Sequence, residues 1–238
     1  MALARELAEA GAPIGTAVLA HEQTRGRGRR GRPFVSPRGG FYLTVIDAAI
    51  EPLSDAWRVG FAAALAAREA LIELGGPEIQ IDWPNDLLLG RGKVGGILTE
   101  VVSAGARAPG AAALPVSLIG IGLNIGPEPS ASAPEEAGPA RALPALACAE
   151  PFVEVAVALL ARVELLCGRC RSTAGWRNVL ESFRHFAVST HGRRVLVHTG
   201  AGTSIEGTSE GIAEDGALLV RRADGRVERL RAGDMLRE

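Results

Sequence analysis

The stretch Gly26–Arg32 constrains this chain most, because it places four arginines among three glycines, with Arg25 directly before it. Glycine permits unusual backbone dihedrals and lets the main chain approach a ligand closely. Arginine adds a permanent positive charge and a fork of donors that matches carboxylate and phosphate groups. Helices and strands do not ordinarily have this composition. The stretch, called here the arginine-glycine loop, therefore predicts a loop that meets anionic oxygens.

A nucleic-acid patch is the alternative reading of such a loop, since arginine- and glycine-rich segments also bind RNA. The whole chain, however, has 26 basic and 27 acidic residues and a net charge of −1. A general nucleic-acid-binding protein usually carries a basic surplus. The positive charge is therefore local, which favours a specific anion site.

The cellular location follows from apolar runs and from cysteine usage. The sequence lacks the run of about eighteen apolar residues that a membrane span needs, and Met1–Glu6 lacks the apolar centre of a signal peptide. The three cysteines, Cys148, Cys167 and Cys170, cannot all pair, which indicates the reducing cytoplasm. Cys167 and Cys170 have the spacing of half a metal site or a redox pair, but no second pair stands nearby, so neither use is favoured.

The hydrophobic patterns predict mixed helices and strands up to about residue 188. Ser54 or Asp55 is expected to cap the second helix, and Gly75 to end it. That helix should bury Trp57, Phe61, Leu65 and Ile72 on one face. The predicted helices are Ala2–Ala10, Ser54–Leu74, Phe152–Leu166 and Gly175–Phe186, and the predicted strands are Thr16–His21, Phe41–Asp47, Ile79–Trp83, Leu87–Leu89, Lys93–Val102 and Val116–Ile125.

Short strands separated by glycine-containing turns follow after about Thr190. With 238 residues and 47% hydrophobic content, the chain has room for one substantial domain and a small second one. We expect a first domain over residues 1–188 and a small barrel or sandwich over residues 189–238. The strands predicted for the second domain are Arg194–His198, Thr203–Thr208, Ala217–Arg222 and Arg226–Leu230.

Four unusual segments require a common explanation: Gln23 with Gly26–Arg32, then Trp83–Asp86, Lys93–Leu98 and Gly120–Asn124. Each lies at a predicted strand end or turn, where binding sites are commonly built. Together they offer arginines, a lysine, one acid, amides and exposed backbone, but no nucleophile with a paired base. This set suits phosphoryl or nucleotidyl transfer, which depends on positioning and charge neutralisation.

In this order the four segments resemble those of biotin protein ligases (biotin–[acetyl-CoA-carboxylase] ligases). The resemblance covers nearly the whole chain, including a strand-rich C-terminal part that ends in Ala232–Asp234. It implies an α+β fold: a mixed β-sheet with helices, like the catalytic domains of class II aminoacyl-tRNA synthetases, followed by a small SH3-like β-barrel. Some members carry an N-terminal DNA-binding domain. This chain shows none, so DNA is not an expected partner.

The resemblance also implies the reaction. Biotin and ATP, with Mg²⁺, would give biotinyl-5′-adenylate and pyrophosphate, and a lysine of a biotin carboxyl carrier protein would then attack the mixed anhydride and release AMP. We expect the arginine-glycine loop to become ordered when the adenylate binds. Dimers are common in the family, so the resemblance allows a homodimer, and it implies no membrane partner.

The resemblance assigns the site residue by residue. Arg29 would offset the charge of the carboxylate and the α-phosphate, Lys93 would stabilise the transition state and the leaving AMP, and Asp86 would hold Mg²⁺ or orient the incoming lysine. Asn124 has an alternative reading as a turn residue that ends a strand, and no metal ligand is assigned with certainty. Biotin contacts are predicted for Gln23, Arg27, Gly28, Arg29, Lys93, Gly95 and Gly96, and nucleotide contacts for Arg27, Arg29, Trp83, Asn85, Lys93 and Asn124.

The chain departs from the family pattern at its start. Family members usually carry a short Ser/Thr-rich stretch that ends in Asn just before the first helix and contacts biotin, and Met1 falls at or just after that point. We expect either a truncated start or weakened biotin binding. A lipoate or octanoate ligase and an inactive biotin-binding relative remain alternatives, although the full arginine-glycine loop and Lys93–Leu98 favour biotin.

Overall fold

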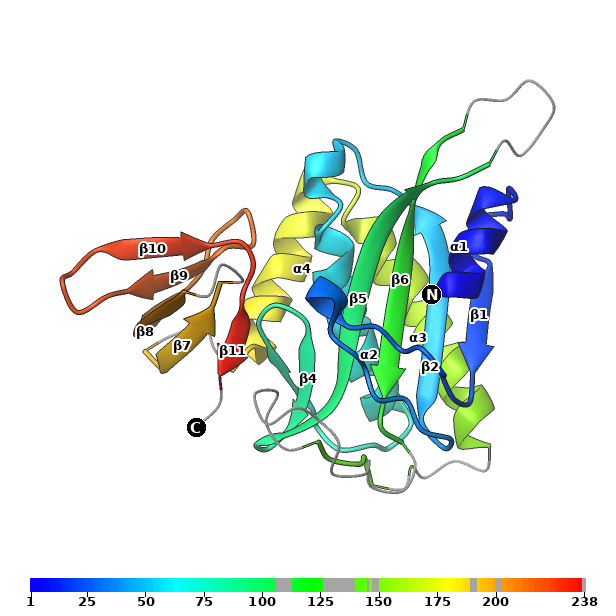
Figure 1. The fold of residues 1–238 in the computed structure, drawn as a ribbon, viewed down its shortest axis with the longest axis horizontal. Coiled ribbons are helices and arrows are strands. Elements are labelled where there is room, and N and C mark those ends of the chain that lie inside the picture. Colours follow the sequence, from blue (N-terminus) through cyan, green and yellow to red (C-terminus); the bar gives the residue numbers. More distant parts are fainter. Residues whose placement is uncertain are drawn as a thin grey trace.

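Two antiparallel sheets with helices against the larger one make up the fold (Figure 1). The computed structural model describes residues 1–105, 113–125, 140–144, 146, 150–188, 192–199 and 203–236. The larger sheet has the order β1-β2-β6-β5-β4-β3 and the smaller one has the order β10-β9-β8-β7-β11. Neighbouring strands are antiparallel, and parallel pairing among the described residues is confined to the isolated bridges Ile81–Ala187 and Lys93–Ala140.

The helices and strands predicted for the first 188 residues are present, with ends shifted by a few residues. Within the described part of the chain, no helix combines the length and the apolar character that a bilayer crossing needs. The helices are α1 (Ala2–Glu9), α2 (Arg58–Glu73), α3 (Pro151–Arg169) and α4 (Thr173–Phe186), and the strands are β1 (Ala17–Ala20), β2 (Phe41–Ala48), β3 (Gln80–Asp82), β4 (Asp86–Leu89), β5 (Gly92–Ser103) and β6 (Pro115–Leu123).

Helix α2 is the centre of the core because it lies between the larger sheet and helices α3 and α4. Its many alanines let these layers approach closely, and most of its residues are buried. The prediction for Ile72 is wrong, since this side chain is 40% exposed. Gly75 ends the helix as expected, with a φ of 70° that suits glycine.

The predicted cap of α2 is also wrong. Ser54 and Asp55 lie in a separate 3-10 turn (Leu53–Asp55), and α2 begins at Arg58 without a side-chain cap. Asp55 instead forms an ion pair with Arg58 at 2.6 Å. The sequence showed a residue type that suits a cap, but the turn moved the helix start three residues beyond it.

The smaller sheet contains the four predicted C-terminal strands and one more. These are β7 (Arg194–His198), β8 (Ser204–Ile212), β9 (Leu218–Arg221), β10 (Val227–Leu230) and the unpredicted β11 (Asp234–Leu236). Among the described residues, β10 and β11 are the two edges of this sheet. The coarse expectation of a small strand-rich unit is confirmed, whereas its closure into a barrel stays a prediction.

Tryptophan side chains attach the smaller sheet to the larger unit. Trp83 donates its indole N–H to the carbonyl of Gly216 at 2.9 Å, and Trp176 donates to the carbonyl of Glu214 at 3.2 Å. Both acceptors lie between β8 and β9, and one hydrophobic core runs through both parts. The C-terminal sheet is therefore fixed beside the turn that follows β3, although the boundary at residues 188 and 189 stays a prediction.

The cysteine pair at the end of α3 provides a first prediction. Cys167 and Cys170 are buried, and burial raises the pKa of both thiols, that of Cys170 to about 12. Since the thiolate is the reactive form, we expect neither to react with a thiol reagent at pH 8 until the protein unfolds. The measurement is chromogenic thiol titration of a Cys148→Ser variant with and without urea, since Cys148 lies outside the described residues. Stoichiometric labelling of the folded protein would contradict this.

Candidate active site

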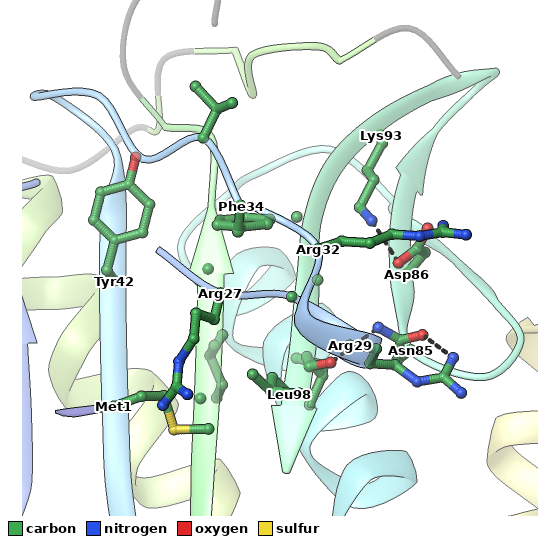
Figure 2. A pocket seen from close by; sticks show the side chains of 18 of the residues that line it. Met1, Arg27, Arg29, Arg32, Phe34, Tyr42, Asn85, Asp86, Lys93 and Leu98 are labelled. Carbon is green, nitrogen blue, oxygen red and sulfur yellow. Dashed lines mark hydrogen bonds and ion pairs between the residues drawn. The ribbon is translucent and has the colours of Figure 1, made fainter. Parts of the chain in front are cut away.

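A cavity of about 210 Å³ lies on the face of the larger sheet opposite α2 and α3, under the segment that joins β1 to β2 (Figure 2). The four sequence segments that were singled out all border it. Every residue that the sequence nominated lines this one cavity: Gln23, Arg27, Gly28, Arg29, Trp83, Asn85, Asp86, Lys93, Gly95, Gly96 and Asn124. Their individual roles stay predictions.

Large apolar residues and glycines alternate along β6, so one face of the strand packs against the core and the other face borders the cavity. Ile119, Ile121 and Leu123 belong to the core cluster with α2, so Gly120 and Gly122 between them face the cavity. This pattern leaves backbone uncovered on the cavity floor.

Close approaches explain two of the glycines. A β-carbon on Gly95 would lie 2.5 Å from the carbonyl oxygen of Gly122 on the neighbouring strand. A β-carbon on Gly122 would lie 2.7 Å from the ring of Phe34, which extends over β6 in Figure 2. Gly95 is therefore needed for the spacing between β5 and β6, and Gly122 is needed because the Phe34 ring packs against it.

Replacing Gly95 with alanine is expected to lower the free energy of unfolding by about 2 kcal/mol, the usual cost of overpacking against a backbone that cannot move freely. The matched control is Gly168→Ala in α3, where the added β-carbon meets only Arg171 Nη1 at 3.6 Å. That control should gain about 0.5–1 kcal/mol, because alanine suits a helix interior better than glycine. Urea titrations measure both, and equal stabilities for the two variants would rule out the crowding at Gly95.

The arginine-glycine loop is a folded hairpin. Arg27 and Pro33 form an antiparallel bridge, and the Gly28 N–H donates to the carbonyl of Arg32 at 2.8 Å. Before the hairpin, Gln23 donates its side-chain amide to Ser36 Oγ at 3.1 Å. The tip is the 3-10 turn η1 (Arg29–Gly31). Three arginines of the hairpin, Arg27, Arg29 and Arg32, line the cavity.

Arg29 is held between two acceptors at the cavity wall. Its Nη1 donates to Asn85 Oδ1 at 2.9 Å (Figure 2). The same nitrogen donates to the carbonyl of Gly233 at 3.1 Å. Asn85 is itself fixed, because its Nδ2 donates to the carbonyl of Ile97 at 2.9 Å. Burial, as the largest cause, lowers the pKa of Arg29. The guanidinium is therefore a poorly hydrated cation in a fixed orientation, which suits an anion in the cavity.

Lys93 and Asp86 form an ion pair at 2.7 Å across the β4–β5 hairpin. A bulge between Leu87 and Leu88 shifts the register there, and bulges commonly re-aim a side chain at a site. A β-carbon on Gly96 would lie 3.5 Å from Lys93 Cε, so a larger residue would cover the pair. The pair remains accessible, with side chains 22% and 21% exposed.

Two residues that were predicted to contact the nucleotide, Asn124 and Trp83, donate side-chain hydrogen bonds to backbone carbonyls. Asn124 Nδ2 donates to the carbonyls of Lys93 and Arg141, each at 3.2 Å. The Trp83 indole is 1% exposed and donates to Gly216. The contacts of Asn124 favour its interpretation as a turn residue that ends a strand. The contact of Trp83 fixes the turn that carries Asn85.

Several residues that line the cavity were not nominated from the sequence. Arg32 lies within the arginine-glycine loop itself, and Asp234 lies in the C-terminal segment that had been noted only as part of the resemblance. The others gave no signal, because an aromatic residue after a loop or a threonine in a strand is common in any core. The unpredicted lining residues include Met1, Arg32, Phe34, Tyr42, Thr44, Leu98, Gly233, Asp234 and Met235.

Comparisons with known proteins agree with this geometry. Residues 2–114 match the Biotin/lipoate A/B protein ligase family, and residues 190–237 match the Biotin protein ligase C terminal domain. The biotin–[acetyl-CoA-carboxylase] ligase of Paracoccus denitrificans is 36% identical over 220 residues, which are 88% of this chain and 85% of that protein.

Solved structures share the fold. The biotin protein ligase from Aquifex aeolicus in complex with biotin and ATP superposes with a TM-score of 0.72 at 23% identity, covering 97% of this chain and 91% of that one. The biotin protein ligase from Leishmania major in complex with biotinyl-5-AMP superposes with a TM-score of 0.58 at 27% identity, covering 97% and 94%.

The fold, the cavity and the two matched segments define a member of the biotin and lipoate protein ligase class. Within that class, the chain is most like a biotin ligase, because it is 36% identical to the Paracoccus ligase over most of both chains. The chain belongs to the biotin protein ligase family, in the branch of the biotin–[acetyl-CoA-carboxylase] ligases.

Proposed function

We propose that this protein is an ATP-dependent biotin protein ligase. It would form biotinyl-5′-adenylate from biotin and ATP and then transfer biotin to a lysine of a biotin carboxyl carrier protein, such as that of acetyl-CoA carboxylase. One observation carries the proposal beyond family membership: Arg29 and Lys93, from segments far apart in the sequence, line the same glycine-floored cavity.

The first step joins two anions, the biotin carboxylate and the α-phosphate of ATP, and their repulsion must be offset. Arg27, Arg29 and Lys93 lie on different sides of the cavity in Figure 2, so they can surround the reacting groups with positive charge. Fixed cations stabilise charge that develops in a transition state without reorganising. The carboxylate oxygen attacks the α-phosphorus, and pyrophosphate leaves.

Mg²⁺ would supply charge neutralisation of the triphosphate. Mg²⁺ is usually bound through one or two carboxylates together with substrate phosphates. Among the described residues, no group of three or more His, Cys, Asp and Glu side chains could hold a metal, so a dedicated protein cage is not the expected mode. Asp86, which lines the cavity, is the residue that would hold an ion brought in by ATP.

In the second step the amine of the carrier lysine attacks the carbonyl carbon of the mixed anhydride, and AMP leaves with the electron pair of the broken C–O bond. Lys93 would stabilise the negative charge that develops on the departing phosphate oxygen. Asp86, whose Oδ1 lies 2.7 Å from Lys93 Nζ, would attract and orient the incoming lysine, which attacks as the neutral amine after it has lost its proton to water.

Carrier modification tests the proposal directly. The protein is incubated with biotin, ATP, Mg²⁺ and a biotin carrier domain, and the carrier is weighed by mass spectrometry. The expected result is the added mass of one biotin on the carrier. Parallel reactions use octanoate or lipoate with a lipoyl domain, because the matched family includes ligases of those acids. Acylation of the lipoyl domain alone would overturn the proposal in favour of the lipoate class.

The finer architecture is part of the same proposal. The five C-terminal strands would form the SH3-like barrel of the family, the protein would act in the cytoplasm, and two copies would associate as a homodimer. Sedimentation velocity with and without biotin and ATP tests the dimer. A monomer under both conditions would remove that part of the proposal.

A further inference from the structure

Arg30 and Arg32 of the arginine-glycine loop contact the C-terminal sheet at the first rung of the ladder between β7 and β11. His198 of β7 and Asp234 of β11 are opposed partners in that ladder. Arg30 Nη1 donates to the carbonyl of His198 at 3.1 Å and to Asp234 Oδ2 at 3.0 Å. Arg32 Nη2 reaches the same carboxylate oxygen at 3.0 Å. One carboxylate from the C-terminal sheet therefore binds two arginines of the loop.

The backbone of Arg30 shows that this contact is not a passive surface ion pair. Arg30 has φ 57° and ψ 27°, and among the described residues it is the one non-glycine residue with a positive φ. This left-handed conformation is unfavourable for a residue with a side chain. Contacts elsewhere must offset the cost. The bonds to His198 and Asp234 are the side-chain contacts of Arg30 that can offset it.

The left-handed turn also divides the loop between two surfaces. Arg29 extends to Asn85 at the cavity, whereas Arg30 does not line the cavity and extends to the C-terminal sheet. Arg29 contacts the same sheet through the carbonyl of Gly233, the residue next to Asp234. The position of Arg29 is therefore coupled to the position of Asp234 on β11.

Gly233 brings β11 close to the turn that holds Asn85. A β-carbon on Gly233 would lie 2.3 Å from Val197 Cγ1 and 3.5 Å from Trp83 Cζ3. Trp83 in turn donates to Gly216 of the same C-terminal unit. The loop, the Trp83–Asn85 turn and the C-terminal sheet therefore form a closed set of contacts around Arg29.

We propose that Asp234 is a positioning residue: its carboxylate holds Arg30 and Arg32 so that Arg29 is aimed into the cavity, and the C-terminal sheet thereby sets the affinity of the site for the nucleotide. This inference rests on the proposed function, because ATP is the ligand whose binding is measured. Removing Asp234 would also free two cations that attract phosphate. Of these two cations only Arg32 lines the cavity, so the gain is limited to one arginine, and the loss of position outweighs it.

The test compares Asp234→Asn with Asp224→Asn. Asp224 belongs to the same C-terminal unit but lies in the turn between β9 and β10, where it pairs with Arg226 at 3.2 Å. Two quantities are measured: the rate at which trypsin cuts the loop in ligand-free protein, and the KM for ATP with the kcat of pyrophosphate release. We expect Asp234→Asn to raise both the cutting rate and the KM about tenfold, with a smaller change in kcat, and Asp224→Asn to change neither.

Two results would overturn the proposal. One is an Asp234→Asn variant that matches Asp224→Asn in either measurement. The other is a lower KM for ATP, which would mean that the carboxylate competes with phosphate rather than positioning the loop. A wild-type protein that releases no pyrophosphate would defeat the proposed function, while the trypsin measurement on ligand-free protein would still decide whether Asp234 fixes the loop.

A second variant guards against a folding defect in β11. Arg30→Gln removes the loop side of the contact and leaves the rung between β7 and β11 in place. It should change both measurements in the same direction as Asp234→Asn but by less, because Arg32 keeps its ion pair with Asp234. The double variant should be no worse than Asp234→Asn by more than a small factor, because the contact between Arg30 and Asp234 is already lost there. Fully additive effects on KM would reject the coupling between Arg30 and Asp234.

Discussion

Replacing Arg29 with alanine is expected to lower kcat/KM for biotinyl-adenylate formation by about 10²- to 10³-fold, the usual loss when one fixed donor to a developing charge is removed. Arg29 suits this role because Asn85 and the carbonyl of Gly233 fix its guanidinium and because partial burial, which lowers its pKa, reduces its hydration. The measurement is pyrophosphate release with biotin and ATP in the absence of carrier, which isolates the first step.

Two further variants make this result specific. Arg25→Ala removes an exposed arginine just before the loop that does not line the cavity, and it should leave the rate within about twofold of wild type. Arg29→Lys keeps the charge but loses the planar fork, so its rate should fall between those of Arg29→Ala and wild type. If Arg29→Ala and Arg25→Ala have the same rate, Arg29 does not act on the acyl-phosphate.

Local chemistry made the residues of the site predictable from sequence. Glycines beside arginines, an amide and an acid after a strand, and a lysine before paired glycines are all unusual within regular structure, so each segment was singled out. The expectation of a strand end or turn is wrong for the paired glycines, because Gly95 and Gly96 lie inside β5. Strand β6 shows the same point, because the alternation from Ile119 to Leu123 assigns one face to the core and one to the cavity. Such signals need only neighbouring residues to be read.

Contacts between distant segments could not be predicted in this way. Asp234 and Arg30 are 204 residues apart, and Trp83 and Gly216 are 133 apart, so neither pair leaves a periodic pattern. Arg30 itself is neither glycine nor asparagine, so nothing at its position signalled a left-handed conformation, although Gly31 beside it also has a positive φ. The start of α2 was missed for a related reason, since Asp55 pairs with Arg58 instead of capping the helix.

Lys93 carries a compositional signal that is visible once the site is known. It is the sole lysine of the sequence, beside 25 arginines. In a chain that uses arginine at its other basic positions, a lysine at the cavity indicates a need for a compact ammonium instead of a planar guanidinium. The bulge beside it and the pairing with Asp86 place that ammonium at the cavity.

We therefore expect Lys93→Met to lower kcat for biotinyl-adenylate formation by about 10²- to 10³-fold, with the KM for biotin changed much less, because the lost charge acts in the transition state. Lys93→Arg should recover less than about a tenth of the lost rate, although it restores the charge, because a guanidinium cannot take the position of the ammonium beside Asp86. Transfer from added biotinyl-5′-adenylate to the carrier domain is measured separately and should also slow.

Arg91→Met is the matched control, because Arg91 is an exposed cation at the tip of the same β4–β5 hairpin and does not line the cavity. It loses the same charge from the same element and should keep the wild-type rate. The absence of any other lysine in the sequence also makes the readout clean, since biotin found on an internal lysine of the enzyme can only be on Lys93. A Lys93→Arg variant with wild-type kcat would show that the site needs only a positive charge there, and the argument for a compact ammonium would fail.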